Sequence, residues 1–255
     1  MNALRQHSIK NACSDTQDCL VVGAGINGAV AAAALAGRGA KVTVIDKSDF
    51  ASFTSQESSN LAWGGIKYLE SYEFGLVWKL CKCRNQLMKS YPGQVREVRF
   101  FTSIAKGFRK PRIVLYFGAL LYWFMGRCQT RPPRLLSRKT ILREAPMVNP
   151  SNLVGGLEYS DCYLIGNDTR FAFGFIQKVL KGGGNAINYM ELNSAEWRDG
   201  LWHCSLRDHV SGEKVGLQAK TMVNAAGPSA DRINTMLGIE TDFKHIFSKG
   251  AHIIV

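Results

Sequence analysis

Apolar and polar residues along positions 18–46 follow a pattern typical of a strand, a helix and a second strand. Residues 19–22 are uniformly apolar, which predicts a buried strand. A glycine-rich turn comes next, and an alanine-rich stretch then favours a helix, because alanine has the highest helix propensity. A second apolar run, residues 42–45, ends at Asp46. We therefore predict a β–α–β unit at the start of the chain.

The same periodicities predict the remaining elements. Apolar residues at helical spacing, bounded by glycine or proline, indicate helices, and short apolar or alternating runs indicate strands. Residues 1–14 are polar and predict a disordered tail. The predicted helices are 71–90, 137–145, 168–181 and 228–237, and the predicted strands are 100–105, 153–165, 186–190, 194–197, 201–206, 215–223 and 249–255.

Three glycines in the first turn, Gly23, Gly25 and Gly28, have the G-x-G-x-x-G spacing of dinucleotide-binding proteins. The first glycine of such a turn allows a tight bend, the second lets the backbone approach a pyrophosphate, and the third lets helix and sheet pack closely. Amides at the helix start favour phosphate. Asp46 is placed to accept hydrogen bonds from a ribose. The pattern predicts a dinucleotide site and leaves NAD and FAD both open.

Composition and charge indicate a folded protein with one strongly basic segment. Of the 255 residues, 46% are hydrophobic and 20% are charged, which is typical of a globular chain. The seven cysteines include no C-x-x-C pair, so neither a disulfide framework nor a zinc site is indicated, and a reducing cytosol is the simplest compartment. Residues 79–143 contain sixteen Lys and Arg against one acid, Glu97, within a total net charge of +12. The basic excess is therefore local.

Residues 113–125 form an unbroken apolar run that is shorter than the ~20 residues needed to span a bilayer. Two interpretations stay open: a helix of the protein core, and an interfacial helix that dips into one leaflet. Nucleic acid is not favoured as a partner, because no recognition motif accompanies the basic charge. In the interfacial interpretation the inserted side chains are Leu120, Leu121, Trp123 and Phe124, and the cations that meet anionic headgroups are Arg109, Lys110, Arg112, Arg127, Arg131 and Arg134.

The segment after Asp46 combines hydroxyl side chains with Leu61, Trp63 and Ile66, which a solvated loop does not need. We expect it to lie against a flat ligand. Residues 54–70, TSQESSNLAWGGIKYLE, resemble the signature TSxxSSKLxHGGxRYLE of FAD-dependent glycerol-3-phosphate dehydrogenases. Further matches to that family occur in order along the chain, at 72–74, 159–162, 168–170, 181–183, 224–228 and 249–252.

The resemblance implies an α/β flavoprotein of the two-dinucleotide-binding-domain, glutathione-reductase type, and favours FAD over NAD. It implies a Rossmann-like FAD domain made of residues 15–72 and 158–240. A partial α+β substrate domain would comprise residues 73–157 and 241–255. The implied FAD-binding residues are Gly23, Ala24, Gly25, Ile26, Asn27, Gly28, Asp46, Lys47, Thr54, Ser55, Ser59, Asn60, Leu61, Trp63, Gly64, Leu192, Ala226 and Gly227.

The resemblance also implies an activity. It is the oxidation of sn-glycerol 3-phosphate to dihydroxyacetone phosphate, with hydride transfer to the flavin and electrons passed on to quinone. The implied location is the cytoplasm, peripheral on the cytoplasmic face of the inner membrane. Lys67, Arg170 and His252 are the candidate catalytic residues, with Lys67 placed to contact an anionic substrate. No metal site is expected.

Three positions depart from the family signature: Asn60 replaces Lys, Trp63 replaces His, and Lys67 replaces Arg. Tryptophan substitutes an apolar ring for a proton acceptor, and lysine lacks the bidentate fork that suits phosphate. Two alternatives therefore stay open. One is a related flavoenzyme that acts on an amine, an amino acid or another hydroxy compound. The other is a truncated, catalytically inactive flavin-binding fragment, because family members continue well past residue 255.

Overall fold

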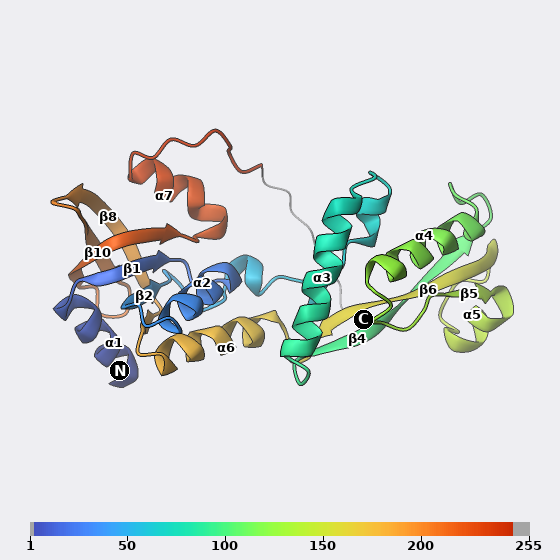
Figure 1. Ribbon diagram of the computed structural model, residues 1–255, viewed down its shortest axis with the longest axis horizontal. Coiled ribbons are helices and arrows are strands. Elements are labelled where there is room, and N and C mark those ends of the chain that lie inside the picture. Colours follow the sequence, from blue (N-terminus) through green and yellow to red (C-terminus); the bar gives the residue numbers. More distant parts are fainter. Residues whose placement is uncertain (1–2, 247–255) are drawn as a thin grey trace. The chain divides into compact units, whose positions relative to one another are not determined.

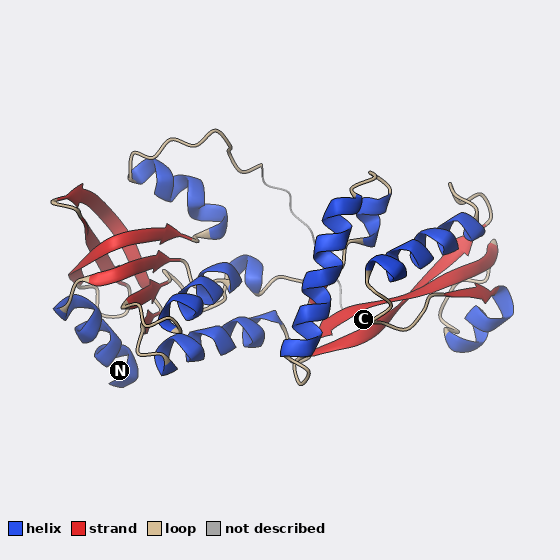
Figure 2. Ribbon diagram, in the orientation of Figure 1, coloured by secondary structure: helices blue, strands red, loops and turns tan. Residues whose placement is uncertain are grey.

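The structure is a computed structural model that describes residues 3–246 (Figures 1 and 2). The chain divides into two compact units: unit 1 comprises Met1–Ser59 and Asn167–Val255, and unit 2 comprises Asn60–Gly166. The sequence predicts these boundaries at residues 72/73 and 157/158. The inserted unit is longer than predicted at both ends, because strand β3 (Leu61–Ala62) pairs with strand β6 (Leu153–Leu164) and so joins the sheet of unit 2.

Unit 1 is built on one mixed six-stranded sheet. The strand order is β7-β2-β1-β10-β9-β8, in which β7, β2, β1 and β10 are parallel and β9 and β8 are antiparallel. The parallel part is the predicted β–α–β unit extended by one strand on each side. The strands are β1 (Gln17–Val22), β2 (Val42–Ile45), β7 (Asn185–Ile187), β8 (Met190–Arg198), β9 (Leu201–Asp208) and β10 (Lys214–Asn224).

Side chains of β1 alternate between two hydrophobic clusters, one on each face of the sheet. Cys19 and Val21 belong to the cluster made with helices α2 (Ile26–Ala36) and α6 (Asp168–Lys181). Leu20 and Val22 belong to the second cluster, which is completed by residues of β8, β9 and β10. Helix α2 buries alanines on its inner face, and these small side chains let it lie close to the sheet and to α6.

The prediction of a disordered tail at residues 1–14 is wrong for the residues that the structure describes. Residues Ala3–Ser14 form helix α1, which buries Arg5, Ser8 and Ala12. Ala12 joins the second hydrophobic cluster of unit 1. The helix escaped prediction because its buried face is largely polar, so no apolar periodicity marks it.

Unit 2 has a four-stranded antiparallel sheet centred on the long strand β6. Strands β3 and β4 (Val95–Ala105) flank β6, and the short strand β5 (Arg134–Ser137) also pairs with it. Its helices are α3 (Phe74–Ser90), α4 (Arg112–Met125) and α5 (Arg138–Glu144), together with the short 3₁₀ helix η2 (Ile66–Leu69). Ser137 caps α5, because its hydroxyl accepts the Thr140 amide at 3.1 Å.

The predicted elements from residue 18 to residue 237 are present with two differences, and the short strands β3 and β5 were not among the predictions. We predicted a single strand over 186–190, but β7 ends at Ile187 and β8 begins at Met190. Tyr189 lies between them with φ +53°, a left-handed conformation that interrupts a strand. The predicted helix after the second glycine turn is divided into η3 (Gly227–Ser229) and α7 (Ala230–Met236). The strand predicted for 249–255 lies outside the described residues.

Candidate functional site

The carboxyl ends of β1, β2 and β10 lie side by side in the parallel part of unit 1. Strand β1 is central, and its partners β2 and β10 lie on opposite sides of it. The Gly23 amide donates to Ile45 O at 2.8 Å, and the Ala225 amide donates to Val22 O at 2.8 Å, so the turns that leave β1 and β10 are held together. In open α/β sheets, ligands bind outside the carboxyl ends of the strands, at the point where successive connections leave a central strand in opposite directions.

Gly23 and Gly28 occupy positions that no other residue fits. Gly23 has φ +102°, and a Cβ atom there would lie 2.4 Å from Ala225 O. A Cβ atom on Gly28 would lie 1.8 Å from Gly23 O. The first glycine therefore lets the β1 turn pack on the turn after β10, and the third lets helix α2 begin directly beneath that turn.

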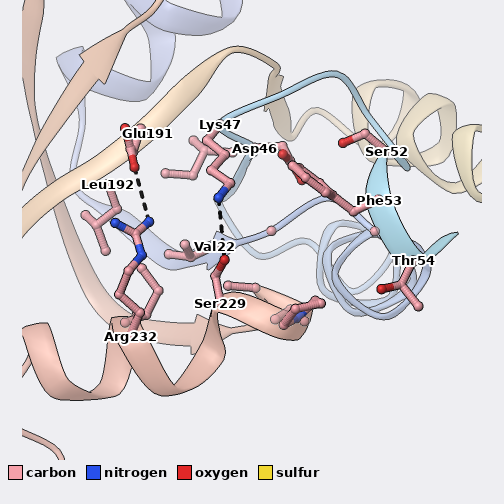
Figure 3. A pocket seen from close by; sticks show the side chains of 18 of the residues that line it. Val22, Asp46, Lys47, Ser52, Phe53, Thr54, Glu191, Leu192, Ser229 and Arg232 are labelled. Atoms are coloured by element: carbon pink, nitrogen blue, oxygen red, sulfur yellow. Dashed lines mark hydrogen bonds and ion pairs between the residues drawn. The ribbon is translucent and has the colours of Figure 1, made fainter. Parts of the chain in front are cut away.

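A pocket opens at these strand ends (Figure 3). Its apolar wall is continuous with the core of unit 1, because several of its side chains are almost completely buried. Its polar rim comes from the loop after β2 and from the start of α7. The apolar wall is Val22, Ile45, Met190, Leu192 and Ile233, and the rim includes Asp46, Lys47, Ser52, Thr54, Ser55, Ser229 and Arg232.

Asp46 lies at the end of β2 with its carboxylate directed at the glycine turn. Its two oxygens accept the amides of Ala24 at 2.8 Å and Ser48 at 2.9 Å. Burial raises the pKa of Asp46 above its ordinary value, although these two amide hydrogen bonds oppose the shift. Because a carboxylate has about four acceptor positions, two remain for hydroxyl groups of a ligand.

Two serines of the loop after β2 face the pocket in different ways. The Ser55 hydroxyl accepts the Ile26 amide at 3.0 Å, so it satisfies the first amide of α2. A Cβ atom on Gly25 would lie 3.1 Å from this same oxygen. Ser52 Oγ is buried, and it has no hydrogen-bond partner among residues 3–246. A buried hydroxyl without a partner at a pocket wall is suited to a polar group of a ligand.

Charged side chains also belong to the polar rim. Lys47 Nζ lies 5.3 Å from the centre of the Phe53 ring and 3.5 Å from Ser229 Oγ (Figure 3). Arg232 pairs with Glu191 at 3.2 Å, and Glu191 also accepts His209 Nε2 at 3.0 Å. Burial alone would raise the pKa of Glu191, but the hydrogen bonds from Arg232 and His209 lower it below its ordinary value. Two cations, Lys47 and Arg232, therefore stand at the mouth where a phosphate charge would be favourable.

The pocket contains half of the residues predicted from the sequence. Pocket residues that the sequence analysis did not name include Ser52, Met190 and Arg232, because the loop and turns that bring them there have no motif of their own. The predicted residues that line it are Gly23, Gly25, Asp46, Lys47, Thr54, Ser55, Leu192, Ala226 and Gly227, whereas Ala24, Ile26, Asn27, Gly28 and Ser59 belong to unit 1 without lining it.

The remaining predicted binding residues, Asn60, Leu61, Trp63 and Gly64, belong to unit 2. The Gly64 amide donates to Asp161 Oδ1 at 2.9 Å, and the Trp63 ring lies 5.8 Å from that of Tyr68. Their contact with a cofactor stays a prediction.

The candidate catalytic residues belong to different parts of the chain. Lys67 is exposed on η2 of unit 2, and Arg170 is exposed in the first turn of α6 in unit 1. Asn167 caps α6, because its side chain accepts the Arg170 amide at 2.8 Å. His252 lies outside the described residues. The three catalytic assignments therefore stay predictions.

Comparison with known proteins finds relatives along almost the whole chain. The chain is 34% identical over 243 residues to aerobic glycerol-3-phosphate dehydrogenase of Escherichia coli, which covers 94% of this chain and 47% of the relative. It is 32% identical over 243 residues to D-erythritol 1-phosphate dehydrogenase of Brucella abortus, with 94% and 47% covered. The chain thus spans about half the length of these relatives.

The fold is shared with solved flavoproteins. Glycerol-3-phosphate dehydrogenase from Bacillus halodurans, complexed with FAD, superposes with a TM-score of 0.69 at 24% identity, over 91% of this chain and 38% of the other. The predicted fold class and the resemblance to glycerol-3-phosphate dehydrogenases are therefore confirmed. The profile of the family described as FAD dependent oxidoreductase matches residues 18–255, so the chain belongs to that family.

Proposed function

We propose that unit 1 binds the adenosine and pyrophosphate part of FAD in the pocket at the ends of β1, β2 and β10. The observation that carries this proposal is the Gly23 turn, which offers backbone amides at the start of α2 and lies beside the turn after β10. Asp46 has acceptor capacity for the ribose diol, and the apolar wall suits the flat adenine ring.

The residues present fit this cofactor in chemistry as well as in place. The buried Ser52 hydroxyl is a polar atom that needs a partner, and Lys47 and Arg232 supply positive charge near the rim. The helix dipole of α2 adds to that charge at its N-terminus. A nucleotide with two phosphates satisfies all of these groups at once.

We further propose that the protein oxidises the secondary alcohol of a phosphorylated polyol, with sn-glycerol 3-phosphate as the first candidate and dihydroxyacetone phosphate as its product. Bound FAD would supply the hydride acceptor. The chain's own residues bind and orient: the unit 1 pocket holds the nucleotide end, and Lys67 provides a cation for the substrate phosphate. Arg170 and His252 stay secondary candidates. The support comes from two relatives, one named as a dehydrogenase of glycerol 3-phosphate and the other of D-erythritol 1-phosphate. Both compounds are phosphorylated polyols.

Flavin retention tests the first step. We expect the purified 255-residue protein to carry FAD with a flavin absorbance spectrum, and Gly25→Val to lose it, because a branched side chain beside Ser55 Oγ takes the space that a phosphate needs. Gly216→Val is the matched control: it lies on β10 in the same unit, and a Cβ atom there meets nothing within 4 Å. Equal FAD content in both variants and the parent would show that the site is misplaced.

A substrate panel tests the second step. Dye reduction with glycerol 3-phosphate, erythritol 1-phosphate, glycerol and glycine would separate phosphorylated polyols from the alternatives of an unphosphorylated hydroxy compound, an amine or an amino acid. FAD binding without turnover on any of them would favour the catalytically inactive fragment. The replacements at Asn60, Trp63 and Lys67 are the features that favour testing this range.

We propose quinone as the electron acceptor and a peripheral contact with the cytoplasmic face of the inner membrane. Helix α4 supports the contact. It buries only Ala119 and Tyr122, while Ile113, Val114, Phe117, Leu121 and Phe124 are exposed. Leu121 and Phe124 are thus available for insertion, whereas Leu120 and Trp123 are half-buried. Among residues 3–246, no helix has the length and apolarity required of a membrane span.

The basic charge around α4 is partly neutralised. Unit 2 contains seventeen Lys and Arg against six Asp and Glu, a net charge of +11. Glu70 pairs with Arg109, and Glu144 and Glu158 pair with Arg134, so acids outside residues 79–143 offset part of the local excess. We expect co-sedimentation with vesicles that contain anionic lipid, and a loss of it in Phe117→Ser/Phe124→Ser. Equal binding by this double variant would remove the proposed contact through α4.

A further inference from the structure

Helix α1 precedes the part of the chain that the family profile matches, which begins at residue 18. It nevertheless docks firmly on unit 1. It contacts β7 and β10, and Ala12 is fully buried in the cluster that also contains Met190 and Leu192 of the pocket wall. The helix therefore lies outside the segment that the profile matches, and it shares its core with the nucleotide pocket.

One side chain of α1, Arg5, makes four hydrogen bonds to the rest of unit 1. The Arg5 guanidinium is 9% exposed and binds both oxygens of Asp208, with Nη1 donating to Oδ2 at 3.0 Å and Nη2 donating to Oδ1 at 2.7 Å. Its Nε and Nη2 also donate to Asn188 O at 3.1 and 2.9 Å. Arg5 thereby joins the end of β9 to the turn between β7 and β8. A bidentate, buried Arg–carboxylate pair of this kind has a fixed geometry.

The turn that Arg5 holds is bonded in turn to the end of β2. Asn188 Nδ2 donates to Asp49 Oδ1 at 2.9 Å, and the Tyr189 amide donates to Ser48 O at 2.9 Å. The Met190 amide donates to Asp46 O at 2.7 Å. Asp46 forms one side of the pocket, and Met190 begins the strand that forms another. Arg5 thus bonds to the residue two positions before Met190, and the Met190 amide adds the one further hydrogen bond that reaches Asp46.

We propose that α1 acts as a latch for the nucleotide pocket, with Arg5 as a positioning residue that fixes the β7–β8 turn and, through it, Asp46 and the Met190–Leu192 wall. The inference rests on the proposed function, because it concerns affinity for the adenosine part of FAD. Tyr189 has a left-handed φ of +53° that a free chain disfavours, so the turn needs the bonds to Asn188 and Tyr189 to keep its shape. Without Arg5, Asp46 and the Met190–Leu192 wall are no longer held in the positions that the nucleotide requires.

Nucleotide affinity in Arg5 variants of the 255-residue protein tests the latch. We expect Arg5→Gln to raise the dissociation constants for FAD and for ADP, measured by titration calorimetry, by about tenfold, which corresponds to about 1.4 kcal/mol. Arg5→Lys keeps the charge without the fork and should fall between Arg5→Gln and the parent. Arg38→Gln is the matched control, because the Arg38 side chain is exposed and, among the described residues, bonds only to Ala34 O near the end of helix α2.

The shape of the titration separates positioning from loss of folded protein. If Arg5 served stability alone, its variants would bind fewer equivalents of ADP at an unchanged dissociation constant. That result would overturn the latch, as would unchanged binding in every respect. If the parent protein binds neither FAD nor ADP, the proposed function fails and the latch fails with it. If Arg5→Gln does not fold, Arg5→Lys carries the test, and parental ADP affinity in that variant would refute the latch.

Discussion

Replacing Gly28 by alanine tests whether the β1 turn is built as described. A Cβ atom at position 28 would lie 1.8 Å from Gly23 O and 3.2 Å from Ala225 Cβ. Carbon and oxygen atoms without a covalent bond stay roughly 3.3 Å apart, so the turn or the helix must move by about 1.5 Å. Overpacking in a close-packed interior costs up to about 3 kcal/mol. We expect a loss of this size in the free energy of unfolding, together with weaker FAD binding.

Gly174 provides the matched control for this substitution. It lies inside α6 of the same unit, and a Cβ atom there would meet nothing within 4 Å. Gly174→Ala should therefore stabilise the protein by about 1 kcal/mol, the ordinary gain from replacing glycine in a helix. Urea unfolding followed by circular dichroism measures both changes. Equal midpoints for the two variants, or a Gly28→Ala midpoint at or above that of the parent, would refute the close packing of the turn.

Three further predictions follow from individual side chains. Arg5 lowers the pKa of Asp208 to about 2. A carboxyl group whose pKa is lower in the folded than in the unfolded state stabilises the fold at higher pH, so about 2.5 kcal/mol should be lost as the pH falls from about 5 to about 1. Asp208→Asn should abolish that part of a pH series of urea midpoints, with Asp15→Asn as an exposed control. Asp46→Ala should weaken FAD binding by roughly ten- to a hundredfold in calorimetry, since hydrogen bonds to a charged group contribute about 1.5–3 kcal/mol. Asp161→Ala should lower stability by about 3–5 kcal/mol by the same urea assay, because it leaves the buried Arg84 without its partner; a loss below 1 kcal/mol would contradict that pairing.

The β–α–β unit was predictable from the sequence because short-range signals define it. Apolar runs, three glycines and a terminal acid lie within thirty residues, and the structure keeps them as β1, α2 and β2. Helix α6 was also predicted, with Asn167 accepting the Arg170 amide at its start. Signals of this kind need no knowledge of the rest of the chain.

Long-range contacts account for what the sequence did not reveal. Helix α1 is held by the pairing of Arg5 with Asp208, two residues that are 203 positions apart. Its buried face carries an arginine and a serine, so the hydrophobic periodicity of the sequence does not indicate a helix there. Arg232 and Ser52 reach the pocket through turns without a motif. No local pattern records a partner on a distant strand.

Unit 2 brings together two segments that resemble the dehydrogenase signature. Strand β3 pairs with β6, which places Leu61 opposite Tyr163 and Ala62 opposite Cys162. Asp161 then accepts the Gly64 amide at 2.9 Å and the Tyr122 hydroxyl at 2.8 Å, and a Cβ atom on Gly64 would lie 2.2 Å from that hydroxyl. The glycine and the aspartate of the two segments are therefore parts of one buried structure.

The departures from the signature fall outside that buried structure. Asn60 and Trp63 are half-buried and Lys67 is exposed, whereas Gly64 and Asp161 are buried. Since Lys67, the implied contact to an anionic substrate, is one of the departures, we expect this protein to differ from its relatives in substrate preference.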